Sequence, residues 1–174
     1  MTDHPTRIEA LPPAALIAFE LWDDTGGAAR RLADALGGAL PDPGRSTSLA
    51  GGWRAIRIEP TVWWLSGPLT GLEDRTVRLT ATLGEEGAVT DLTGGFVRLA
   101  AGGPGWRTLL MFGGVFDAED PAFDPGATVG TILHHVAVRY DVAGEDLVHI
   151  HVAQSYAVDL LAQMRTAAEG LGHS

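Results

Sequence analysis

Residues 128–152 decide the fold, and they read TVGTILHHVAVRYDVAGEDLVHIHV. The part from Thr128 to Val142 is rich in β-branched and apolar residues, which predicts a long strand. The segment from Asp141 to Asp146 combines a glycine with three acidic side chains, which is typical of a turn. Leu147 to Val152 then predicts the returning strand. The stretch is therefore expected to form an antiparallel pair.

Four further stretches have the apolar spacing of helices that cover a sheet. Residues 28–36 and 72–83 place apolar side chains three or four positions apart. Glycines 37 and 38 follow the first of these segments and are expected to end it. Gly105 to Gly113 predicts a short helix. Ser155 to Ala168 predicts a longer one, with Ser155 as its N-cap.

The remaining apolar segments predict more strands. Residues 53–59 and 61–65 are expected to be strands, and residues 88–100 are expected to be a hairpin that turns at Thr93-Gly94-Gly95. The fold class that follows is α+β, an antiparallel sheet built from hairpins with helices packed on it. We expect a single domain over residues 1–174, in which residues 1–27 form an N-terminal arm and residues 28–174 the α+β core.

Composition excludes several classes of function. The chain has 174 residues, and its 45% hydrophobic content is that of a globular protein. Twenty-two acidic residues against 12 basic ones give a net charge of -10, which opposes binding to nucleic acid or to an anionic membrane surface. With no cysteine there is no disulfide, thiolate zinc site or thiol nucleophile. No membrane-spanning run or secretory signal is expected, so the expected location is cytoplasmic.

Histidines offer the one candidate metal site. His149 and His151 stand two positions apart in a predicted strand, so their side chains share a face. If the strands pair across residues 141–146, His134 or His135 approaches them, and such imidazoles could bind Zn, Ni or Cu. The competing reading is that these are partly buried histidines with backbone partners, since no His-Glu-x-x-His motif is present. His149, His151 and His135 are the weak metal candidates.

Other catalytic and cofactor motifs are missing from the sequence. Ser66 stands in Leu-Ser-Gly-Pro and not in Gly-x-Ser-x-Gly. The glycine-rich segment 102–105 contains a proline, which removes a backbone N–H that a phosphate site needs. The acidic segment 117–124 lacks the pattern of a calcium loop. We therefore expect no catalytic residue, no cofactor-binding residue and no cofactor in this chain.

Tryptophans indicate surfaces that contact other proteins. Trp63 and Trp64 are adjacent on a predicted strand, so they point to opposite faces of the sheet. If both are buried, the sheet is covered on both sides, and one cover could be a partner protein, although one tryptophan could instead cover a core edge. The candidate interface comprises the segment Leu11 to Leu21 and four tryptophans: Trp22, Trp53, Trp63 and Trp64.

From Trp63 onward, about two-thirds of the chain resembles the gamma subunit of heterotetrameric sarcosine oxidase, a relative of the aminomethyltransferase folate-binding fold. Four stretches carry the resemblance: Trp64-Leu65-Ser66-Gly67-Pro68, Ala88-Val89-Thr90-Asp91-Leu92-Thr93-Gly94-Gly95, Phe123-Asp124-Pro125-Gly126-Ala127 and Gln154-Ser155-Tyr156-Ala157. Two features depart from the family pattern. Gln154 stands where the family has arginine, and residues 102–106 are unusually rich in glycine.

The resemblance implies an accessory role in a complex that oxidatively demethylates sarcosine or a related N-methyl amine. In that family the gamma subunit is non-catalytic and packs against alpha, beta and delta subunits. FAD, FMN, NAD, tetrahydrofolate and zinc are expected in those partner subunits. Two alternatives stay open: a stand-alone folate- or small-ligand-binding module of the same fold, and a histidine metal-binding protein.

Overall fold

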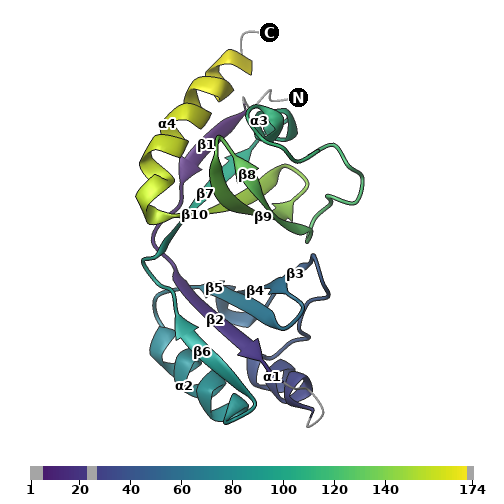
Figure 1. Cartoon of the computed structure of the whole chain (residues 1–174), viewed down its shortest axis with the longest axis vertical. Helices are drawn as coiled ribbons and strands as arrows, with labels where there is room; N and C mark the ends of the chain where they lie inside the picture. The colour runs from purple at the N-terminus through teal and green to yellow at the C-terminus, as the bar shows by residue number, and fades with distance from the viewer. Residues whose placement is uncertain (1–5, 23–26, 172–174) are drawn as a thin grey trace. The chain divides into compact units, whose positions relative to one another are not determined.

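The computed structural model describes residues 6–22 and 27–171, and the chain divides into two compact units (Figure 1). Residues 1–12 and 95–174 belong to the first unit, and residues 13–94 form the second. The α+β class is confirmed, since each unit combines an antiparallel sheet with α-helices. The sequence predicts one core, whereas the structure has two. Each sheet buries its apolar face against helices of its own unit.

The first unit contains a five-stranded sheet and two helices. Its strand order is β1-β7-β10-β9-β8, and every neighbouring pair is antiparallel. The apolar face carries Leu99, Tyr140 and Ile150, which are fully buried with Trp106 of α3 and Leu160 of α4. The elements are β1 (Arg7–Ala10), β7 (Phe96–Gly102), α3 (Trp106–Met111), β8 (Thr128–Leu133), β9 (Val136–Gly144), β10 (Leu147–Ala153) and α4 (Gln154–Leu171).

The second unit repeats this plan with a different strand order. Its sheet runs β3-β4-β5-β2-β6, again with antiparallel neighbours. Phe19, Trp63 and Leu65 line the face that packs on Leu32 of α1 and Leu79 of α2. The elements are β2 (Ala15–Leu21), α1 (Ala28–Leu36), β3 (Ser46–Ser48), the 3₁₀ turn η1 (Ala50–Gly52), β4 (Arg54–Glu59), β5 (Val62–Gly67), α2 (Leu72–Leu83) and β6 (Gly87–Asp91).

The expected N-terminal arm is instead part of both sheets. β1 pairs with β7, and β2 lies between β5 and β6 in the interior of its sheet. Pro12 and Pro13 separate the two strands at the boundary between the units. Proline has no backbone N–H for a sheet ladder, so the pair suits a connection better than a strand.

The predicted hairpin over residues 88–100 is wrong. Its two strands exist as β6 and β7, but β6 pairs with β2 and β7 pairs with β1 and β10. The Thr93-Gly94-Gly95 segment therefore carries the chain from one unit into the other. A glycine-rich turn gives a chain freedom to reverse, but it does not fix which strands pair.

The long strand predicted over residues 128–142 is interrupted at its middle. His134 and His135 both have positive φ, 46° and 68°, and form a two-residue turn between β8 and β9. Such a turn closes a hairpin when both central residues adopt left-handed conformations. The predicted return through Leu147–Val152 is confirmed as β10, which pairs with β9.

All four predicted helices are confirmed, with one correction. α1 ends at Gly37, whose φ of 74° is the left-handed conformation that a glycine cap adopts readily. Ser155 is not an N-cap, because α4 already begins at Gln154.

Within residues 6–22 and 27–171, no helix has both the length and the apolarity to cross a membrane.

Candidate functional site

One face of the first sheet carries a cluster of charged and polar side chains opposite the apolar core. In the β10–β9 register, His149 lies beside Asp141 and His151 beside Arg139, while Arg98 of β7 lies on the other side of His151. His149 and His151 therefore share a face, as the sequence predicts. Asp141 is fully buried and His151 is only 3% exposed, so this group belongs largely to the protein interior.

Burial controls the protonation of this cluster. Loss of solvation lowers the pKa of His151 to about 4, although the neighbouring Asp141 carboxyl opposes the shift. Burial also lowers the pKa of the Arg98 guanidinium, and Asp141 again acts in the opposite direction. His151 is consequently neutral at pH 7. Asp141 is the one carboxyl group of this cluster, and its charge acts on both His151 and Arg98.

The third metal candidate, His135, lies away from this pair. His135 is in the turn between β8 and β9, whereas Arg139 and Asp141 are the β9 residues beside His151 and His149. Among the described residues, no group of three or more histidine, aspartate or glutamate side chains is placed to hold a metal ion. The sequence anticipated the shared face of His149 and His151 but missed the turn at His134 and His135.

The four candidate interface tryptophans divide into two kinds. Trp53 and Trp63 are 5% and 4% exposed and belong to the core of the second unit, so their rings are packed inside this chain. Trp63 stacks on Phe19 with ring centroids 5.5 Å apart. Trp64 is half-buried on the opposite face of β5, and Trp22 is 63% exposed. Of the four candidate interface tryptophans, only Trp22 and Trp64 therefore keep side-chain surface outside the core of the second unit.

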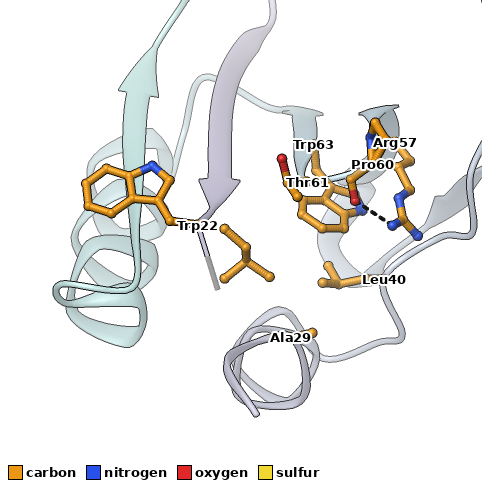
Figure 2. Close-up of a pocket in the computed structure, with 8 residues that line it drawn as sticks. Trp22, Ala29, Leu40, Arg57, Pro60, Thr61 and Trp63 are labelled. Carbon is orange, nitrogen blue, oxygen red and sulfur yellow. Dashed lines mark hydrogen bonds between the residues drawn. The ribbon is translucent and has the colours of Figure 1, made fainter. Parts of the chain in front are cut away.

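A pocket of about 460 Å³ opens in the second unit beside α1 and the β4–β5 turn. Figure 2 shows Trp22 at one side of it, Trp63 and Arg57 at the other, and Ala29 below them. The other lining residues are Leu21, Leu40, Pro60 and Thr61. Sequence analysis missed this pocket, because its walls come from five separate segments that only the fold brings together.

Of the lining residues in the described part of the chain, Arg57 is the only charged one. Its guanidinium lies over the Trp63 ring, 4.9 Å from the centroid, which is a cation–π contact. One terminal nitrogen donates to the Pro60 carbonyl at 2.5 Å and the other to the Pro41 carbonyl at 3.4 Å (Figure 2 draws the first). The pocket thus combines an apolar wall with one held cation.

Comparison with known proteins identifies relatives by family and by fold. The model of the sarcosine oxidase, gamma subunit family matches residues 24–169. None of the curated protein sequences compared with the chain matches it significantly. Among solved structures, a chain of heterotetrameric sarcosine oxidase from Corynebacterium sp. U-96, in complex with pyrrole 2-carboxylate, is similar with a TM-score of 0.87 and 19% identity. That match covers 99% of this chain and 88% of the other.

Two more solved structures share the fold at greater distance. Aminomethyltransferase T of the glycine cleavage system from Bartonella henselae has a TM-score of 0.69 at 21% identity. It matches 96% of this chain, which spans 50% of its length. The regulatory subunit of aspartate kinase from Thermus thermophilus has a TM-score of 0.55 at 13% identity, covering 94% of this chain and 99% of that one. The resemblance inferred from the sequence is confirmed, and the chain belongs to the sarcosine oxidase gamma subunit family.

Proposed function

We propose that this chain is a gamma-type subunit of a heterotetrameric complex that oxidatively demethylates sarcosine or a related N-methyl amine. The observation that carries the proposal is the family match over residues 24–169. The likeness of the fold along nearly the whole chain to a chain of heterotetrameric sarcosine oxidase supports it. This family match favours a subunit over a stand-alone folate module or a histidine metal-binding protein.

The partners in this proposal are alpha, beta and delta subunits. FAD, FMN, NAD, tetrahydrofolate and zinc are expected in those partners, and the complex is expected in the cytoplasm. The role of this chain is to pack against them. What supports a packing role is that Asp141 and His151, the two buried residues of the polar cluster, are withdrawn from solvent and from any substrate dissolved in it.

The exposed tryptophan is the first candidate for contact with a partner. Trp22 follows β2 and leaves 63% of its surface to solvent, an unusual exposure for so large an apolar ring. Buried tryptophans are frequent anchors of protein interfaces, since they remove much apolar area from water. We expect Trp22→Ala to weaken assembly about tenfold or more, with little change in the thermal stability of the isolated chain.

Oxygen consumption with sarcosine tests the role of the chain. The isolated chain is expected to consume none. The complex purified by co-expression with its partners is expected to be active and to contain this chain in stoichiometric amount. Omission of the chain should reduce the yield of intact complex. Turnover of sarcosine by the chain alone would contradict the proposal, and so would an intact, fully active complex formed without it.

A further inference from the structure

The pocket beside Arg57 contains a positive charge, and none of its lining residues that the structure describes is acidic. Both acceptors of the guanidinium, Pro41 and Pro60, are neutral backbone carbonyls. Among the residues that the structure describes, no carboxylate forms an ion pair with Arg57, and none lines the pocket. A guanidinium whose hydrogen-bond acceptors are neutral carbonyls has no counter-charge in the site and attracts an anion.

Two buried N–H groups at the same place also lack acceptors. Within the described residues, neither the Arg57 Nε nor the Trp63 indole Nε1 has a hydrogen-bond partner. The Trp63 side chain is more than nine-tenths buried, so this N–H has lost its contact with bulk water. A buried donor left unpaired destabilises its surroundings, and an oxygen acceptor that reaches both N–H groups would remove this cost.

The rest of the pocket sets the shape of the ligand. Leu21, Leu40 and Ala29 supply aliphatic walls, and Trp22 borders the pocket at the side opposite Arg57 with its ring directed away from Trp63 (Figure 2). A volume of about 460 Å³ is within the range of small-molecule sites. Both unpaired N–H groups are covered by neighbouring atoms, so a ligand that accepts from them must displace the Arg57 guanidinium from the Pro41 and Pro60 carbonyls.

We propose that this pocket binds a small monocarboxylate with a compact apolar or aromatic body. The carboxylate accepts from Arg57 and from the Trp63 indole N–H, and the body lies against Leu21, Ala29 and Leu40. The proposal goes beyond the subunit role, because membership of the gamma subunit family assigns no ligand to this chain. It concerns the second unit alone, which contains every lining residue.

Titration of the full-length chain with benzoate, followed by the ¹H–¹⁵N resonances of the tryptophan indoles, tests the proposal. The Trp63 resonance is assigned from Trp63→Phe, which keeps an aromatic ring and removes the N–H. Benzoate is expected to shift this resonance saturably. Benzamide, which has the same body without the charge, is expected to bind at least about tenfold more weakly.

Two arginine variants on one strand provide a matched comparison. Arg57→Gln removes the charge in the pocket and is expected to weaken benzoate binding at least about tenfold. Arg54→Gln makes the same change on β4, where Arg54 instead donates to Ser46 and Ser48, and it should leave binding within about twofold. Three results would overturn the proposal: a Trp63 indole resonance unmoved by benzoate in the wild-type chain, equal affinity for benzamide, or unchanged affinity in Arg57→Gln. All are measured on the chain alone, so they are independent of whether the oxidase complex forms.

Discussion

At the scale of single residues, the buried ring of Trp53 packs so closely on Gly67 that no side chain fits at that position. A Cβ added to Gly67 would lie 2.3 Å from the Trp53 ring. Gly67→Ala must therefore displace a core indole, and we expect a loss of about 1–3 kcal/mol of unfolding free energy. Gly144→Ala is the control, because a Cβ there meets nothing within 4 Å. Urea denaturation of both variants measures the difference, and equal stabilities would contradict this account of the packing.

His151 gives the stability of the chain a dependence on pH. Burial lowers the pKa of His151 in the folded chain to about 4, against about 6.5 when unfolded. Between these values the unfolded chain binds the proton and the folded chain does not, so stability falls as the pH drops from about 6.5 to about 4. The full effect is about 3 kcal/mol at about 1.4 kcal/mol per pKa unit.

The variant His151→Gln isolates this contribution from the titration of carboxyl groups. It keeps a polar side chain but cannot take up a proton in this range. Its unfolding free energy should fall less steeply than that of the wild type between pH 6.5 and pH 4, as measured by chemical denaturation at several pH values. Parallel curves for the two proteins would show that burial of His151 does not control this dependence.

At the scale of secondary structure, β2 is the element on which the second unit depends most. It joins β5 to β6, so both of its edges are hydrogen-bonded. Ala18→Pro removes a backbone donor and is expected to destabilise the unit by about 3 kcal/mol or more. Ala18→Ser retains the donor and should cost far less. Thermal unfolding distinguishes them, and a mild effect of the proline would mean that residues 15–21 behave as the arm that the sequence predicts.

The turn between β8 and β9 places two residues other than glycine, His134 and His135, in the strained left-handed conformation. His135 has φ of 68° and is exposed, so its side chain contributes little packing. His135→Gly is expected to stabilise the chain by about 1 kcal/mol relative to His135→Ala, because alanine retains the left-handed conformation at a steric cost. Comparison of the two melting temperatures measures this. A more stable alanine variant would contradict it.

The sequence predicts well those elements that depend on residues close together in the chain. The helix over residues 28–36 was predictable because Leu32 and Leu36 face one side and Gly37 ends it. The pairing of β6 and β7 was not, because the partners of these strands lie in distant parts of the chain. The turn at His134 and His135 escaped detection because neither residue is a glycine or asparagine, the usual signals of positive φ.

At the scale of the whole molecule, short sequence motifs indicate the family of the chain, whereas the residues that reach its surface depend on how the chain folds. Short motifs between Trp64 and Ala157 were enough to indicate the gamma subunit family, which the family model confirms. Which tryptophans reach the surface could not be predicted in the same way. Trp22 follows a leucine and Trp53 follows two glycines, and neither context indicates that the fold exposes the first ring and buries the second. The pocket beside Arg57 likewise depends on contacts between distant segments.

The central claim is that this chain acts by binding larger partners. Purification of the tagged chain from its native cells, followed by mass spectrometry of the intact assembly and its flavin absorbance, tests it directly. The account predicts an assembly of four different polypeptides that carries flavin. Recovery of this chain alone, or only as copies of itself without flavin, would contradict the claim.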